Sequence, residues 1–216
     1  MDGWDIAYQL ILLTAFIVSL NVFKVPGTKY KVLPYLLGIT NLVELTIFFT
    51  KNTNPSYPIY YHFFIPLEYS LLAYFYTLHI SKNLVRKIVI LSIPIVVICC
   101  FAISFSTGFY KFPTFQFNIA GVSLAVLALF SLFSLEIDSS RSIFNNPLFL
   151  INVGILVFYS GNLFLMGLYN SLRENNIDLA RLLFRSINTT LNFIMYSLFI
   201  IAFLCLSTRK SLTPLS

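Results

Sequence analysis

Two carboxylates, Glu44 and Glu68, lie within long apolar stretches of this 216-residue chain. An ionisable side chain in hydrocarbon costs about 2.5–3.5 kcal/mol on insertion scales and usually faces the interior of a helix bundle. A carboxyl group placed there can contact a ligand, carry a proton or form an interhelical hydrogen bond. Such a hydrogen bond is worth only about 0.6 kcal/mol in membrane proteins. Glu44 and Glu68 are therefore our first candidates for a ligand or proton site, and a structural role for them stays open.

Further polar residues recur at helical spacing near these two acids. Asn41 precedes Glu44 by three residues and can share its face, whereas His62 and Tyr69 are seven apart and form a stripe on a face that excludes Glu68. The remaining candidates occur in two later apolar stretches and are Tyr159, Asn192 and Tyr196. Interhelical hydrogen bonding remains the alternative role for these residues.

The pattern indicates neither a metal site nor a catalytic set. His62 and Glu68 are six residues apart, which places them on different faces of one helix. No spacing of a nucleophile and a base is visible, so we predict no catalytic residue. We also predict no cofactor.

The candidate residues lie in a chain with seven long apolar stretches, and its composition indicates that these stretches are helices in a membrane. The chain is 58% hydrophobic and 10% charged, whereas soluble domains have about 25% charged residues. We predict an all-α integral membrane protein that forms one seven-helix domain over residues 1–216. About 20 apolar residues span a bilayer, and the predicted spans are Asp5–Phe23, Leu33–Thr50, Pro58–Ile80, Leu84–Phe105, Phe115–Leu135, Pro147–Tyr169 and Ile187–Leu206.

Lysine and arginine predict the orientation of these spans. Cytoplasmic loops of membrane proteins carry an excess of basic residues. With the N-terminus outside, nine of the 14 basic residues lie on the cytoplasmic side, and the other five are Lys51, Lys111, Arg173, Arg181 and Arg185. We therefore expect the N-terminus outside and the C-terminus in the cytoplasm.

The longest outer connection runs from Asn170 to Ser186. Asn175 or Asn176 can cap a helix that starts at Ile177, which favours an interfacial helix or an extension of the seventh helix. Within it Arg181 and Arg185 share one face. These two arginines could instead form an outer basic lip for an anionic ligand or partner.

Several short motifs resemble those of uncharacterised seven-helix membrane proteins of Bacteroidota-type bacteria. The resemblance lies in Tyr61–Tyr69, Asn146–Phe149, Tyr159–Asn162 and Leu191–Tyr196. It implies the seven-helix topology and a bacterial inner membrane, and it implies no activity.

Three functions are compatible with this reading. The first is a sensory or signalling subunit that binds a small or lipidic ligand between helices and acts through a cytoplasmic or membrane partner. The second is a small proton-coupled transporter that uses Glu44 or Glu68, and the third is an intramembrane lipid-modifying enzyme. We expect contact with membrane lipids and no binding of nucleic acid. We also expect no retinal on the seventh helix, because Ile187–Leu206 contains no lysine.

Overall fold

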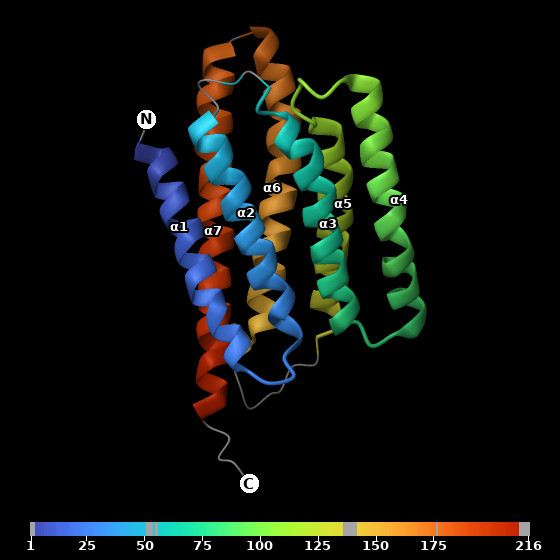
Figure 1. Ribbon diagram of the computed structural model, residues 1–216, viewed down its shortest axis with the longest axis vertical. Helices are drawn as coiled ribbons and strands as arrows, with labels where there is room; N and C mark the ends of the chain where they lie inside the picture. Colours follow the sequence, from blue (N-terminus) through green and yellow to red (C-terminus); the bar gives the residue numbers. More distant parts are fainter. Residues whose placement is uncertain (1–2, 51–53, 55, 136–141, 176, 212–216) are drawn as a thin grey trace.

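The computed structural model describes residues 3–50, 54, 56–135, 142–175 and 177–211. Within these residues the chain forms seven α-helices and three short 3₁₀ helices, and no strand (Figure 1). The elements are α1 (Gly3–Ser19), η1 (Leu20–Lys24), η2 (Lys29–Lys31), α2 (Val32–Thr50), α3 (Ile59–His79), α4 (Asn83–Thr107), α5 (Thr114–Phe133), η3 (Ile143–Asn145), α6 (Pro147–Asn175) and α7 (Ile177–Ser211).

The chain is an all-α bundle of the membrane type. Six of the helices in the described residues are long and apolar enough to cross a bilayer. The exception among the long helices is α3, because its tyrosines, two histidines and Glu68 lower its hydropathy. The outward faces of the bundle carry large apolar side chains such as Leu91, Ile98 and Phe133, which is the surface that lipid requires.

The helix boundaries agree with the local sequence signals. The first five predicted spans match their helices to within two residues when η1 is counted with α1. Helix α4 ends before Gly108, whose φ of 83° is a left-handed conformation that favours glycine. Pro147 begins α6, and the Asn146 side chain accepts a hydrogen bond from the Leu148 amide at 3.0 Å.

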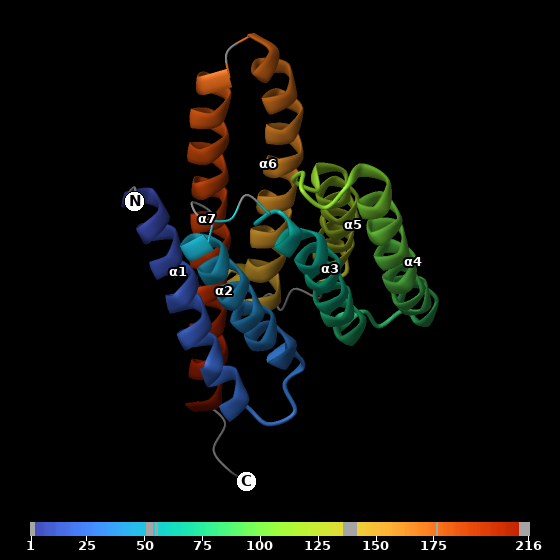
Figure 2. The same ribbon diagram turned by 45° about the horizontal axis from the view of Figure 1, so that its top comes forward.

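The last two helices extend beyond the predicted spans. Helix α6 continues to Asn175, and α7 begins at Ile177, which confirms the predicted helix start at that residue. Figure 2 shows both helices projecting past the other five at the end of the bundle that holds the N-terminus. The side chains of the two proposed capping residues, Asn175 and Asn176, lie outside the described part of the chain, as do the whole of Lys51 and Arg141.

Six helices form a closed ring, and α4 lies outside it. Neighbouring helices pack in the order α1, α2, α3, α5, α6 and α7, and α7 packs back on α1. Helix α4 packs against α3 and α5, and it stands at one edge of the molecule in Figure 1. The centre of the ring is therefore enclosed by six helices.

Small residues allow the close approach of helices in the second half of the ring. A Cβ atom at Gly161 would lie 2.7 Å from Leu191 Cδ2, and one at Gly154 would lie 3.4 Å from the Met195 carbonyl oxygen. A Cβ at Gly121 on α5 would meet the Tyr159 ring at 3.2 Å. These glycines therefore serve helix packing.

The two ends of the ring are packed differently. Toward the C-terminus, fully buried apolar residues from four helices fill its centre, among them Leu37, Phe75, Ile155 and Phe203. The half of the ring nearer the N-terminus holds the cavity described below.

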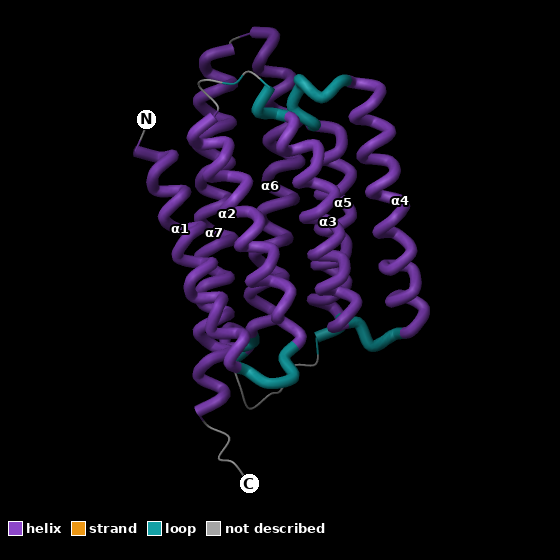
Figure 3. The backbone as a smooth tube through the Cα atoms, in the orientation of Figure 1, coloured by secondary structure: helices purple, strands orange, loops and turns teal. Residues whose placement is uncertain are grey.

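Connections lie at both ends of the bundle in alternation along the chain (Figure 3).

Candidate ligand-binding cavity

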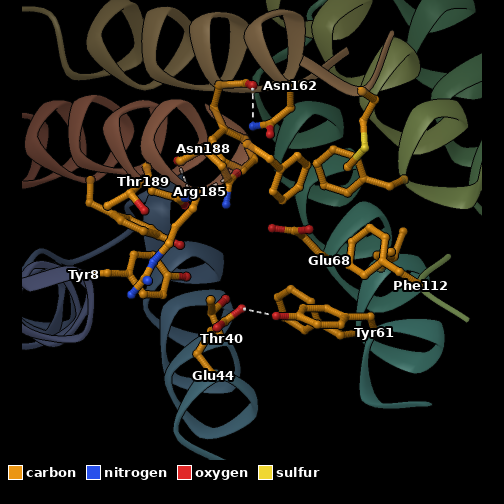
Figure 4. Close-up of a pocket in the computed structure, with 18 of the residues that line it drawn as sticks. Tyr8, Thr40, Glu44, Tyr61, Glu68, Phe112, Asn162, Arg185, Asn188 and Thr189 are labelled. Carbon is orange, nitrogen blue, oxygen red and sulfur yellow. Dashed lines mark hydrogen bonds between the residues drawn. The ribbon is translucent and has the colours of Figure 1, made fainter. Parts of the chain in front are cut away.

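A cavity of about 280 Å³ lies inside the ring, toward the end that holds the N-terminus (Figure 4). Each of the six ring helices contributes to its wall, and so does Phe112 from the connection between α4 and α5. The polar residues of the wall are Asp5, Tyr8, Thr40, Glu44, Tyr61, Glu68, Asn162, Arg185, Asn188, Thr189, Asn192 and Tyr196. The apolar residues are Phe64, Ile65, Phe112, Phe117, Phe158, Met166 and Phe184. Pockets that hold small molecules have this mixed character.

Glu44 enters the cavity from α2. It lies six residues from the upper end of that helix at Thr50, roughly 9 Å along the axis at 1.5 Å per residue. The Tyr61 hydroxyl on α3 donates a long hydrogen bond of 3.4 Å to Glu44 Oε1 (Figure 4). Tyr61 itself packs against the Phe112 ring, with centroids 5.2 Å apart.

Glu68 enters the cavity from α3 and lies deeper than Glu44. It is nine residues from Ile59, where α3 begins, or roughly 14 Å along the axis. Its carboxylate points into the cavity (Figure 4), and Glu68 also lines a smaller void together with Tyr159 of α6. Among the described residues no basic side chain pairs with Glu68.

An ion pair lies at the margin of the cavity nearest the end of the bundle that holds the N-terminus. Arg185 Nη2 on α7 donates to Asp5 Oδ1 on α1 at 2.9 Å, with both side chains partly exposed. Arg185 is the one basic residue among those described that line the cavity, and its charge is balanced by Asp5. Arg181, the other residue of the predicted basic lip, lies 3.8 Å from Asp178 and does not line the cavity.

The wall formed by α7 is a ladder of polar side chains four residues apart, Asn188, Asn192 and Tyr196. Asn192 Nδ2 donates to the Asn188 carbonyl oxygen at 2.9 Å. Tyr196, four residues further, packs against Tyr8 of α1 with ring centroids 6.2 Å apart. The ladder therefore spans the cavity from its upper part to its floor.

Asn162 contributes to the cavity wall an acceptor that finds no partner among the described residues. The residue is 1% exposed and lines the cavity from α6. Its Nδ2 donates to the Phe158 carbonyl oxygen at 2.9 Å. A carbonyl oxygen only accepts, so the amide orientation is fixed and Oδ1 is the remaining atom. Within the described structure Asn162 Oδ1 is buried without a hydrogen-bond partner.

A second, very small void lies beneath the cavity. Its volume is about 10 Å³, and it shares Thr40, Glu68 and Tyr196 with the larger cavity. Tyr159 lines this void and not the larger one. A void of this size holds one water molecule at most.

His62, a sequence-predicted site residue, faces away from the cavity. Its Nε2 donates to the Lys111 carbonyl oxygen at 2.8 Å, and its Nδ1 lies 2.9 Å from Ser104 Oγ and 3.1 Å from Gln116 Nε2. Since Nε2 carries the proton, Nδ1 accepts from the Gln116 amide. His62 is fully buried, and it ties the upper end of α3 to α4 and α5.

Two other predicted site residues also lie outside the cavity. Tyr69 bonds Ser92 Oγ on α4 at 2.8 Å. Asn41 Nδ2 donates to the carbonyl oxygens of Leu37 at 2.8 Å and Leu12 at 3.3 Å, which links α2 to α1. The structure thus brings Glu44, Glu68, Asn192, Tyr196 and Arg185 together, with Tyr159 behind Glu68. It assigns helix packing to His62, Tyr69 and Asn41.

Sequence reasoning missed several wall residues. Tyr8 and Tyr61 have the signal of interface aromatics, which is equally typical of residues that face lipid headgroups. Asp5 meets Arg185 across 180 positions of sequence, and no local pattern reports such a contact. Asn188 is different, because its spacing of four residues from Asn192 already places it in the same polar series as Asn192 and Tyr196 in the sequence.

Neither histidine lines the cavity with Glu68. His79 Nδ1 bonds the Phe75 carbonyl oxygen at 2.9 Å, and its ring packs against Tyr30 and Phe75. The described residues also contain no group of three His, Cys, Asp or Glu side chains that could hold a metal ion.

Comparison of the chain with protein-family models, with curated proteins and with solved structures finds no match in any of the three.

Proposed function

We propose that the protein is a multi-pass membrane sensory or signalling subunit. It binds a small ligand in the cavity and passes a helix shift to a partner. The observation that carries the proposal is the asymmetry of the ring, which is hollow and polar toward the N-terminus and solid toward the C-terminus. A cavity that is closed at one end suits binding and release from the same side of the membrane.

The proposal includes the topology. All seven helices cross the bilayer, with the N-terminus outside and the C-terminus in the cytoplasm of a bacterial inner membrane. The alternation of connections between the two ends supports seven crossings (Figure 3). The excess of basic residues on the C-terminal side supports the orientation. Helix α3 spans despite its polar residues, since Glu68 and His62 face the protein interior.

The ring gives a ligand a means of moving helices. Helices α2 and α3 are separated from α6 and α7 by the cavity, while the contacts α1–α7 and α3–α5 close the ring at its sides. A ligand that bridges the cavity would draw these helices together. The described chain consists of helices and short connections, so the signal would pass to a partner in the membrane or the cytoplasm.

This function can be tested before the ligand is known, by measuring from which side of the membrane a reagent reaches the cavity. In a variant with Cys99, Cys100 and Cys205 replaced by alanine, Thr189→Cys places a thiol on the cavity wall. Reconstituted vesicles are treated with a membrane-impermeant thiol reagent from each side in turn. Ser186→Cys, at an exposed position near the N-terminal end, and Ser81→Cys, at an exposed position of the opposite end, report which side the reagent reaches.

We expect Thr189→Cys to react only from the side at which Ser186→Cys reacts. Reaction from the side of Ser81→Cys would contradict a one-sided cavity and therefore the sensory function. The existence of a signalling partner is tested by crosslinking the protein in native lipid and identifying what is recovered with it. Recovery of the isolated protein alone would count against the signalling role.

A proton-coupled transporter is the second candidate. The observation that favours it is the small void beneath Glu68, which continues the hollow space beyond the main cavity. Opening of this void toward the C-terminal side would connect the two faces of the membrane through Glu68. Proton-driven uptake by vesicles that Glu44→Gln and Glu68→Gln both abolish would favour this candidate, and unchanged uptake in both variants would exclude it.

A further inference from the structure

The charge of the cavity wall restricts the kind of ligand that it can hold. Glu44 and Glu68 both line the cavity, and the single lining arginine among the described residues is engaged by Asp5. Taking a carboxylate out of water is costly unless an opposite charge accompanies it. An anionic ligand would add a third negative group to this space, whereas a cation would balance the carboxylate of Glu68.

The remaining wall also suits a cation. Eight of the nineteen lining residues are aromatic, and they include Tyr8, Phe117 and Phe158. The faces of aromatic rings carry partial negative charge and attract ammonium groups within about 6 Å of the ring centre. Phe117 and Phe158 lie beside one another with ring centroids 6.5 Å apart in an edge-to-face arrangement.

Asn162 narrows the choice among cations. Its Oδ1 is buried, has no partner in the described structure and belongs to a residue of the cavity wall. A buried acceptor without a donor is costly, so its partner is expected to come from the ligand. A quaternary ammonium has no N–H group, whereas a primary or secondary ammonium can donate to both Asn162 and Glu68.

We propose that the cavity binds a small organic ammonium ion with N–H donors, which contacts the Glu68 carboxylate and Asn162 Oδ1 and is surrounded by aromatic rings. The inference rests on the proposed function of the cavity as a ligand site and names its ligand class. The volume of about 280 Å³ lies just below the range of about 300–1,000 Å³ for pockets of drug-sized molecules, which indicates an amine with one short apolar group.

The probes are 2-phenylethylamine and smaller primary amines, with three analogues of the first that differ only in the polar group. 2-Phenylethanol is neutral, trimethyl(2-phenylethyl)ammonium lacks N–H donors, and 3-phenylpropanoate is an anion. Binding is measured by calorimetry on the full chain in nanodiscs of phosphatidylcholine, with empty nanodiscs as the blank. This lipid has no net charge, which limits adsorption of the amines to the membrane.

We expect saturable binding of a primary amine, and binding of the alcohol and the anion that is at least tenfold weaker. Glu68→Gln should weaken amine binding on the order of 10–100-fold, because a hydrogen bond to a charged group is lost. Asp178→Asn is the matched control, since Asp178 is an exposed acid outside the cavity. Asn162→Leu should weaken the primary amine more than its trimethyl analogue.

Three results would overturn the inference. They are the absence of saturable binding by every amine, equal affinity for the amine and the alcohol, and an amine affinity that Glu68→Gln leaves unchanged in a variant that unfolds at the wild-type temperature. Failure of the ammonium inference would leave the one-sided labelling of Thr189→Cys intact. Two-sided labelling would refute the sensory function whatever the probes show.

Discussion

Glu44 on α2 and Glu68 on α3 line the same cavity, although they belong to different helices and lie at different depths. The Tyr61 hydroxyl donates to Glu44, whereas Glu68 shares the small void beneath the cavity with Tyr159. Two carboxyl groups in one enclosed space disfavour each other's charge. Their placement is therefore better explained by a ligand than by stability alone.

This explanation predicts that Glu68→Gln leaves the ligand-free protein as stable as the wild type or slightly more stable. Glutamine has nearly the same size and removes one acid from the cavity. The change in the free energy of unfolding should be within about 0.6 kcal/mol, the typical worth of an interhelical hydrogen bond in a membrane. Denaturation in mixed micelles measures it, and a loss of about 2 kcal/mol or more would mean that the carboxylate is structural.

The Asp5–Arg185 ion pair should couple the first and last helices only modestly. Exposed pairs contribute about 0.2–1 kcal/mol, and the side chains of this pair are 24% and 40% exposed. A double-mutant cycle with Asp5→Asn and Arg185→Gln should give a coupling energy in the upper half of that range.

The Asp178–Arg181 pair provides the control for that cycle. Its side chains are 90% and 66% exposed and lie 3.8 Å apart, so its coupling energy should be close to zero. Equal coupling energies in the two cycles would show that α1 and α7 are not joined by a specific contact.

His62→Phe should destabilise the protein without affecting the cavity. Phenylalanine can retain the ring contact with Phe109, at 5.1 Å between centroids, but it leaves the Lys111 carbonyl oxygen without its donor. A buried polar group left unpaired costs about 1–3 kcal/mol, and thermal unfolding should show that loss. Amine affinity should remain at the wild-type value in the folded fraction, and a specific loss of affinity would place His62 in the binding site.

Gly161→Ala should destabilise the contact between α6 and α7. The added Cβ would lie 2.7 Å from Leu191 Cδ2, and overpacking of this kind costs about 1–3 kcal/mol. In a Leu191→Ala background the clash is absent, so the same substitution should be neutral or stabilising, since alanine is favoured over glycine within helices by about 0.5–1 kcal/mol. The same destabilisation in both backgrounds would contradict the packing seen here.

The helices could be predicted from sequence because hydropathy and turn residues are local properties. Gly108 and Pro147 mark helix ends by their own conformational preferences, and the predicted spans follow. The span predicted for α6 ends at Tyr169, six residues before the helix ends at Asn175, because its last turns are more polar than a membrane-spanning segment.

The site was predictable in part. Costly residues in apolar stretches single out Glu44, Glu68, Asn192 and Tyr196 as candidates, and the structure places all four on the wall of one cavity, a placement that the sequence leaves open. His62 and Tyr69 are equally unusual in lipid, but they face α4 and α5, a helix arrangement that no periodicity along α3 reports. Which face of α3 meets the cavity depends on α4 lying outside the ring, and this is a property of tertiary packing.

Three consecutive residues of α3 face three different environments. Leu67 is exposed on the outer surface, Glu68 lines the cavity, and Tyr69 is buried against α4. Cysteine at each position, in the chain without its native cysteines, can be labelled with a water-soluble and with a lipid-soluble thiol reagent. This comparison tests the central claim, which is that Glu68 faces a hydrated cavity inside the ring.

The predicted result is that the water-soluble reagent labels Glu68→Cys alone, the lipid-soluble reagent labels Leu67→Cys, and Tyr69→Cys resists both reagents while the protein stays folded. Labelling of Tyr69→Cys by the water-soluble reagent in preference to Glu68→Cys would contradict the claim, because it would turn the other face of α3 toward water.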